Sequence, residues 1–161
     1  MIYYLSLGSN LGDRRGELRL AVDFLRTLGS VERISGIYET EPQGMSVAGL
    51  FLNLAAALET PLEPEALLAS IKAYESSRGR DLENSHCQPR PIDIDILLAG
   101  KCELDTPALT VPHPRVTERA FVLLPLAEIA PGACHPQSGK TVAELAAPWR
   151  DDRGVRRIGE L

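Results

Sequence analysis

Two aspartates stand two residues apart in the run Arg90-Pro91-Ile92-Asp93-Ile94-Asp95-Ile96-Leu97-Leu98. Side chains alternate between the faces of a β-strand, so the isoleucines would face a core while Asp93 and Asp95 share the other face. Neighbouring carboxylates repel each other and favour a cation between them, and Mg²⁺ prefers oxygen ligands while keeping positions for phosphate and water. The pattern predicts a site for two Mg²⁺ ions around a polyphosphate. A solvated strand face would show the same alternation.

Cationic residues lie close to this run in the sequence. Arg80 and Arg90 bracket an irregular polar segment, and His113 and Arg119 follow a short way on. Guanidinium groups match phosphate oxygens and stabilise the charge that spreads in phosphoryl transfer. Glu75, at the end of an expected helix, offers a third carboxylate or a nucleotide contact. Each of these residues singly is equally typical of an exposed surface, so only their combination predicts an ATP–Mg²⁺ site.

The elements that must position these residues follow from hydrophobic periodicity and turn residues. We expect strands over Ile2 to Leu7, Val31 to Thr40, Phe51 to Leu58 and Ile92 to Ala99. We expect helices from the cap Asp13 to Gly29, from Pro64 to Gly79, from about Glu118 to Ile129 and from Val142 to Ala147, with loops over Glu41 to Gly49 and Arg80 to Pro89. This order predicts an α+β fold, a ferredoxin-like βαββαβ sandwich with an antiparallel sheet and a C-terminal helical extension.

Composition limits the classes of function. The chain has 161 residues, 44% of them hydrophobic, which fits a single domain over residues 1–161. Its net charge of −5 gives no general attraction for nucleic acid or an anionic membrane. The longest apolar stretch, Ala120 to Ala127, is too short to cross a bilayer. The N-terminus enters a strand pattern without a leader, and the three cysteines lack CxxC spacing. We expect a cytoplasmic monomer with small-molecule substrates and neither nucleic-acid nor membrane partners.

Four further segments agree with the aspartate run. They are Leu5 to Arg14 (LSLGSNLGDR), Tyr38 to Gly44 (YETEPQG), Phe51 to Leu54 (FLNL) and Leu109 to Arg115 (LTVPHPR), the last continuing through Arg119, Phe121 and Leu126 to Pro131. In this order the five segments resemble the 6-hydroxymethyl-7,8-dihydropterin pyrophosphokinases, over about residues 1 to 145. The resemblance implies transfer of pyrophosphate from ATP to the reduced hydroxymethyl pterin in folate biosynthesis, with release of AMP and two Mg²⁺ ions.

The resemblance also implies roles for particular residues. The metal ligands are Asp93 and Asp95, and these act in catalysis with Arg80 and Arg90. The nucleotide-side positions are Glu75, Arg80, Arg90, Ile96, Thr110, His113 and Arg119. The pterin-side positions are Thr40, Pro42, Gln43, Phe51, Asn53 and Phe121. Two aromatic rings and an amide suit a flat heterocycle, although core packing alone would account for both phenylalanines.

The sequence departs from the family in one segment. The family usually carries Arg-Trp-Gly-Pro-Arg, whereas His86 and Cys87 stand here in the places of the Arg and Trp, and Leu82 replaces another cation. We expect weaker loop closure and a slower chemical step, with the metal site intact. The alternatives are a pseudo-enzyme, another two-metal phosphoryl or nucleotidyl transferase, and a non-catalytic ferredoxin-like module.

Overall fold

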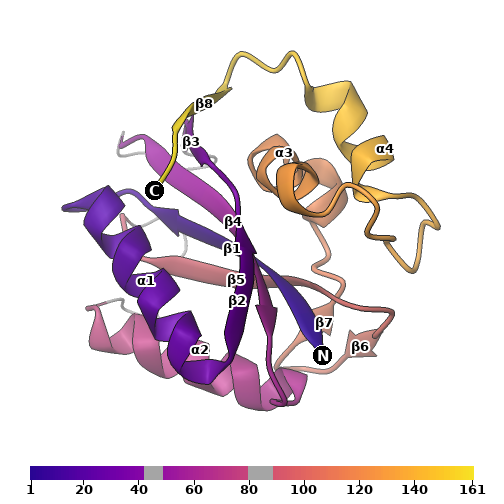
Figure 1. Cartoon of the computed structure of the whole chain (residues 1–161), viewed down its shortest axis with the longest axis horizontal. Coiled ribbons are helices and arrows are strands. Elements are labelled where there is room, and N and C mark those ends of the chain that lie inside the picture. Colours follow the sequence, from indigo (N-terminus) through magenta and orange to yellow (C-terminus); the bar gives the residue numbers. More distant parts are fainter. Residues whose placement is uncertain (42–48, 80–88) are drawn as a thin grey trace.

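The computed structural model describes residues 1–41, 49–79 and 89–161 (Figure 1). Its strands are β1 (Ile2–Ser9), β2 (Ser30–Ile34), β3 (Ile37–Thr40), β4 (Phe51–Glu59), β5 (Asp93–Ala99), β6 (Leu104–Asp105), β7 (Thr110–Val111) and β8 (Val155–Gly159). Its α-helices are α1 (Arg14–Leu28), α2 (Pro64–Ser77), α3 (Ala120–Ile129) and α4 (Val142–Ala146), and its 3₁₀ helices are η1 (Val116–Glu118) and η2 (Ala147–Trp149).

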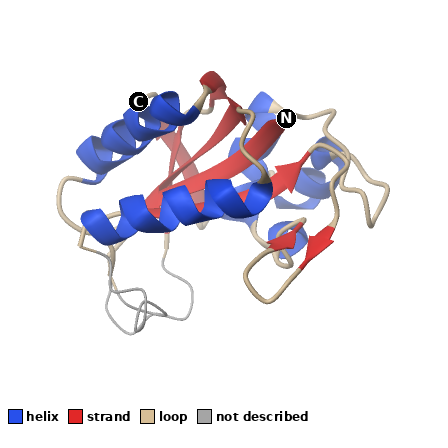
Figure 2. Ribbon diagram, turned by 90° about the horizontal axis from the view of Figure 1, so that it is seen from below, coloured by secondary structure: helices blue, strands red, loops and turns tan. Residues whose placement is uncertain are grey.

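The main sheet is antiparallel and runs in the order β5-β1-β4-β3-β8, with β2 also pairing with β4. The short strands β6 and β7 form a separate pair. Helices α1 and α2 cover one face of the main sheet, and α3 and α4 lie on the other side (Figures 1 and 2). The predicted α+β class, antiparallel sheet and C-terminal helical extension are confirmed.

Alternation along the central strands produces a core on each face of the sheet. On β1, Tyr3, Leu5 and Leu7 are fully buried in the core that includes α1 and α2. On β4, Ala55 and Ala57 belong to a second core that they share with α3. Because β4 has covered neighbours on both faces, it reads as a nearly unbroken apolar run rather than an alternating one.

The predicted strand over Val31 to Thr40 is wrong as a single element, because the chain breaks at Ser35-Gly36 into β2 and β3. Ser35 Oγ accepts a hydrogen bond from the Ala55 amide at 2.9 Å, so a side chain takes the place of a ladder carbonyl. The Gly36 amide donates to Glu128 Oε1 at 3.0 Å instead of to a neighbouring strand. These side-chain contacts come from distant parts of the chain, so local sequence carries no sign of them.

The helix ends follow the local signals more closely. Asp13 caps α1, with its Oδ1 accepting from the Gly16 amide at 3.1 Å, and α2 begins at Pro64, both as predicted. The helix expected from about Glu118 begins at Ala120 after the 3₁₀ turn η1. Strands β6, β7 and β8 were not predicted. The two predicted loops lie mostly outside the described residues, and no helix within the described ranges is long and apolar enough to cross a membrane.

Candidate active site

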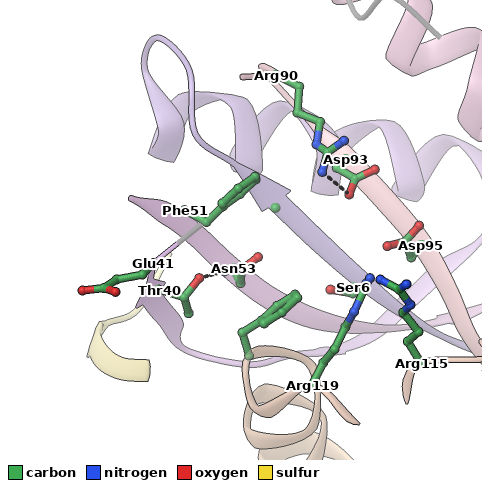
Figure 3. A pocket seen from close by; sticks show the side chains of 12 residues that line it. Ser6, Thr40, Glu41, Phe51, Asn53, Arg90, Asp93, Asp95, Arg115 and Arg119 are labelled. Atoms are coloured by element: carbon green, nitrogen blue, oxygen red, sulfur yellow. Dashed lines mark hydrogen bonds and ion pairs between the residues drawn. The ribbon is translucent and has the colours of Figure 1, made fainter. Parts of the chain in front are cut away.

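A pocket of about 120 Å³ opens on the α3 side of the sheet, at the end where polar side chains replace the apolar ones (Figure 3). The register of the strands explains which side chains form the floor of this pocket. Gly8 on β1 lies between Asn53 on β4 and Asp93 on β5, and Ser6 lies opposite Asp95. Small residues on the middle strand therefore leave open space between an amide on one side and two carboxylates on the other.

Asp93 and Asp95 project from β5 into this pocket as the alternation predicted. Both are half-buried, whereas Ile94 between them is buried with 3% exposure on the opposite face. Arg90 approaches the first carboxylate from the chain just before β5, with Arg90 Nη2 lying 3.8 Å from Asp93 Oδ2. Its guanidinium also lies over the Phe51 ring, 5.7 Å from the centroid, in a cation–π arrangement.

The opposite wall combines a buried polar pair with two aromatic rings. Asn53 and Thr40 are 3% and 4% exposed, and Asn53 Nδ2 donates to Thr40 Oγ1 at 2.8 Å. This hydrogen bond fixes the side-chain amide in the pocket wall. Phe51 and Phe121 line the same cavity from β4 and α3. The wall can therefore hold a flat heterocycle by ring contacts while the amide reads its polar edge.

The turn after β1 fixes the position of Arg90. Asn10 is 8% exposed. Its backbone amide donates to the Arg90 carbonyl at 3.2 Å, and its side-chain Oδ1 accepts from the Arg90 backbone amide at 2.8 Å. This reciprocal pair joins the end of β1 to the residue that precedes the aspartate strand. The Gly8-to-Gly12 turn therefore supports the site through a side-chain amide.

Arg119 and His113 are both partly withdrawn from water. Burial lowers the pKa of Arg119; Asp95 opposes this shift and Arg115 adds to it. Burial also lowers the pKa of His113, and Arg119 lowers it further. His113 Nδ1 accepts from the Arg115 amide at 3.1 Å, so this nitrogen is the unprotonated one and the neutral ring carries its proton on Nε2. Arg119 also lies 5.6 Å from the centroid of the Phe121 ring.

The structure brings many, but not all, of the predicted site residues together. Those that line the pocket are Thr40, Phe51, Asn53, Arg90, Asp93, Asp95, Arg119 and Phe121. Those that do not are Glu75, Ile96, Thr110 and His113. The remaining predicted residues, Pro42, Gln43 and Arg80, lie outside the described residues, as do Leu82, His86 and Cys87.

Glu75 lies behind the aspartate strand rather than in the pocket. It is 3% exposed, and its Oε1 accepts from the Ile94 amide at 2.7 Å. A carboxylate at this place anchors β5 to α2 from the opposite side. Ile96 is likewise buried in the core beneath the sheet.

The carboxylate oxygens of this site suit Mg²⁺ better than they suit a metal ion whose ligands all come from the protein. The described ranges contain no group of three or more His, Cys, Asp and Glu that could hold an ion. Asp93 and Asp95 share one face of β5 beside open space, which suits a cation that takes its other oxygens from phosphate and water.

Sequence reasoning missed four residues that line the pocket: Ser6, Gly8, Glu41 and Arg115. Ser6 and Gly8 could have been found from the period of β1, because they are the small residues on the face opposite Leu5 and Leu7. Arg115 was part of a recognised segment, but nothing in its local sequence shows that its side chain turns toward β5.

Comparison with known proteins gives a consistent result. The model of the family described as 7,8-dihydro-6-hydroxymethylpterin-pyrophosphokinase (HPPK) matches residues 4–131. A Bacillus subtilis protein named 2-amino-4-hydroxy-6-hydroxymethyldihydropteridine pyrophosphokinase is 41% identical over 157 residues, covering 96% of this chain and 93% of its own. A protein of the same name from Pseudomonas aeruginosa is 40% identical, covering 96% and 95%.

A crystal structure of Plasmodium falciparum HPPK-DHPS superposes with a TM-score of 0.73 at 18% identity. The match covers 92% of this chain and 45% of the Plasmodium chain, so this chain spans less than half of that longer protein. At this identity the superposition shows a shared fold.

Proposed function

This chain belongs to the 7,8-dihydro-6-hydroxymethylpterin-pyrophosphokinase family, and we propose that its reaction takes place in the pocket beside Asp93 and Asp95. The protein is an ATP-dependent pyrophosphokinase of folate synthesis, which transfers the pyrophosphoryl group of ATP to 6-hydroxymethyl-7,8-dihydropterin. One observation carries the placement: a single cavity joins a buried amide and two aromatic rings to a pair of carboxylates.

The pterin occupies the side of the pocket formed by β4 and α3. Its flat ring lies between Phe51 and Phe121, and the Asn53 amide, held by Thr40, reads the polar edge of the heterocycle. Burial strengthens this selection, because a pterin-like molecule that lacks the matching polar atoms would leave the amide unpaired.

The polyphosphate of ATP occupies the side formed by β5. Arg90, fixed by Asn10 and by the Phe51 ring, is aimed at charge that develops on the phosphoryl oxygens. Arg119 supplies a second guanidinium from the start of α3. Because both cations are positioned before the substrate arrives, they need little reorganisation during the reaction.

Asp93 and Asp95 would hold magnesium on the β5 side of the pocket, in agreement with the fit of their carboxylate oxygens to this ion. When bound, Mg²⁺ supplies neutralisation of phosphate charge and polarisation of the phosphoryl group. The two carboxylates contribute by fixing where that charge sits relative to the pterin side of the pocket.

In the transfer step the pterin hydroxymethyl oxygen forms a bond to the β-phosphorus of ATP. The bond between this phosphorus and the oxygen bridging to the α-phosphorus breaks, so AMP leaves with the bridging oxygen and the hydroxyl proton is released. The residues act mainly by aligning the two oxygens and stabilising charge, which suffices for phosphoryl-group chemistry.

The direct test is to incubate the purified protein with ATP, Mg²⁺ and the reduced pterin alcohol and to separate the products. We expect one AMP per pterin diphosphate, and no AMP when the pterin or Mg²⁺ is omitted. Release of pyrophosphate would identify a nucleotidyl transferase instead. Binding without any turnover would identify a pseudo-enzyme or a ligand-binding module, and either result would contradict the proposal. We further propose a cytoplasmic monomer, and sedimentation velocity tests its oligomeric state.

A further inference from the structure

Arg115 lines the same pocket, but the steps described above give it no role. Figure 3 shows its guanidinium beside that of Arg119, on the side of the pocket near Asp95 and away from Arg90. The two arginines flank the 3₁₀ turn η1, in the segment between β7 and α3. They therefore approach the phosphate side of the pocket from the wall opposite Arg90.

The backbone of Arg115 is fixed from both directions. The His113 amide donates to the Leu97 carbonyl of β5 at 2.9 Å, and the Arg115 amide donates to His113 Nδ1 at 3.1 Å. The next residue, Val116, is 2% exposed and donates to the His113 carbonyl at 3.1 Å. The side chain thus starts from a rigid point that is tied to the aspartate strand.

The charges around Arg115 favour an anion. No ion pair of the Arg115 side chain is recorded within residues 1–41, 49–79 and 89–161. Burial has the largest effect on Arg119 and lowers its pKa, while Asp95 opposes this shift. The nearby charge of Arg115 lowers the pKa further, because two neighbouring guanidinium charges repel each other. An anion between the two groups would relieve this repulsion.

The sequence supplies few other cations for this purpose. Residues 80–88 contain one arginine and no lysine, together with Asp81 and Glu83. A triphosphate carries several negative charges, and guanidinium groups on the described wall of the pocket can match the charge that Mg²⁺ leaves.

We propose that Arg115 is a polyphosphate-binding residue, which together with Arg119 contacts the phosphate chain of ATP at the end of the pocket beside Asp95. This assignment rests on the proposed function only in placing ATP on the β5 side of the pocket. A planar guanidinium fork can contact two phosphate oxygens at once, whereas a lysine would provide a single point of charge.

The test compares Arg115→Ala, Arg115→Lys and the matched surface variant Arg19→Ala. Arg19 is exposed on α1, which packs on the face of the sheet opposite the pocket. The probes are α,β-methylene ATP with Mg²⁺, inorganic tripolyphosphate with Mg²⁺, and the reduced pterin alcohol alone, with each Kd measured by calorimetry or competition. The α,β-methylene analogue is chosen because the reaction breaks the α–β bridge.

We expect Arg115→Ala to raise the Kd of the ATP analogue and of tripolyphosphate by similar factors, about 10- to 100-fold, as for loss of hydrogen bonds to a charged group. Arg115→Lys should recover part of this affinity. The Kd of the pterin should stay within about twofold of the wild-type value, and Arg19→Ala should leave all three unchanged.

Several outcomes would overturn the inference. One is an analogue Kd for Arg115→Ala that matches Arg19→Ala, and another is a loss for the analogue without a loss for tripolyphosphate. Equal weakening of all three probes would indicate collapse of the pocket and would also reject the assignment. If the wild-type protein released no AMP from the pterin reaction while Arg115→Ala still lost tripolyphosphate affinity, the proposed function would fail and this inference would stand. If the wild-type protein released AMP normally and Arg115→Ala kept its affinity for tripolyphosphate, the proposed function would stand and this inference would fail.

Discussion

Two groups of charged residues border helix α3, one near each end. The pocket cluster at its start consists of Arg90, Asp93, Asp95, Arg115 and Arg119. The edge cluster near its end consists of Tyr38, Glu128, Arg157 and Glu160, and it joins α3 to β3 and to the chain around β8. Both clusters combine carboxylates with guanidinium groups, so residue types alone do not separate them.

The polar groups of the edge cluster form short hydrogen bonds with one another. Both oxygens of Glu128 accept hydrogen bonds, from Tyr38 at 2.7 Å, from Arg157 at 3.1 and 3.3 Å and from the Gly36 amide at 3.0 Å. Burial, with the Glu128 contact adding to it, raises the pKa of Tyr38 to about 12. In the pocket cluster, by contrast, the charged side chains line an open cavity, where Arg90 Nη2 lies 3.8 Å from Asp93 Oδ2. Mutual short contacts indicate a structural role, whereas charged side chains that line a cavity can also contact a ligand.

Asp95→Ala tests this comparison with the largest expected effect. We expect AMP formation to slow by about 10³-fold or more, since loss of preorganised charge stabilisation costs about 4 kcal/mol in such sites. The free energy of unfolding should change by less than about 1 kcal/mol, because the half-buried residue lies at the pocket surface. Product assays and urea denaturation measure the two quantities. The exposed Asp151→Ala is the control, and a rate within tenfold of wild type would contradict the assignment.

Gly8→Ala tests the shape of the pocket floor. A Cβ at this position would lie 2.7 Å from Asn53 Oδ1, so the amide must shift and strain its hydrogen bond to Thr40. We expect the Kd of the pterin to rise about 10-fold, equivalent to about 1.4 kcal/mol, with a smaller effect on the ATP analogue. Gly132→Ala is the matched control, because an added Cβ meets nothing within 4 Å there. Unchanged pterin affinity would show that Asn53 does not read the ligand.

The parts of the fold that sequence predicted well are those set by local chemistry. The alternation from Ile92 to Ile96 gave the faces of β5, and the Asp13 cap and Pro64 gave the starts of two helices. Period and capping act over a few residues, so the sequence of a segment contains them. For the same reason the alternation predicts that both aspartates share the face of the strand away from the core, and this face lines the pocket.

The parts that sequence missed depend on distant partners. The break between β2 and β3 is stabilised by Glu128, some ninety residues away in the sequence, through the Gly36 amide. Glu75 carries the pattern of a solvated helix residue, yet it is buried because it accepts from the Ile94 amide of another element. Arg115 lines the pocket from a turn that the His113 amide ties to Leu97 of β5. Tertiary contacts of this kind override local propensity.

Glu128→Gln tests the edge cluster. In contrast to Asp95→Ala, it should lower the stability of the fold and leave the rate of AMP formation nearly unchanged. We expect a loss of about 1 to 2 kcal/mol in the free energy of unfolding at pH 7, because charge-assisted hydrogen bonds become neutral ones and the site is partly screened by water. The rate per folded molecule should stay within twofold of wild type. Combined with Tyr38→Phe in a double-mutant cycle, the two changes should be non-additive. Tyr4→Phe is the control, because Tyr4 lies on β1, which is separated from β3 by β4.

The same cluster predicts a dependence on pH. Burial opposes ionisation of Glu128, but the hydrogen bonds from Arg157, Tyr38 and Gly36 outweigh it and lower its pKa overall. Because the folded-state pKa of Glu128 is lowered, the unfolded chain binds the proton more readily than the folded one. The stabilisation contributed by Glu128 is therefore complete above the pKa of a carboxyl group in the unfolded chain, and it is lost as the pH falls through the folded-state pKa. The stability gap between wild type and Glu128→Gln should therefore narrow in acid. A gap that widened below pH 4 would contradict this linkage.

Arg156→Ala should change the free energy of unfolding least of these substitutions. It shows how little a short but exposed ion pair contributes. Arg156 Nη2 lies 2.7 Å from Glu39 Oε1, a distance as short as any in the edge cluster. Its side chain is 66% exposed, however, and Glu39 keeps a second guanidinium, that of Arg14, at 3.6 Å. Water and the remaining cation replace the lost partner, so we expect at most about 0.5 kcal/mol in unfolding free energy. Denaturation at low and high salt measures it. A loss as large as that of Glu128→Gln would show that short distance, rather than mutual satisfaction and burial, distinguishes the structural cluster.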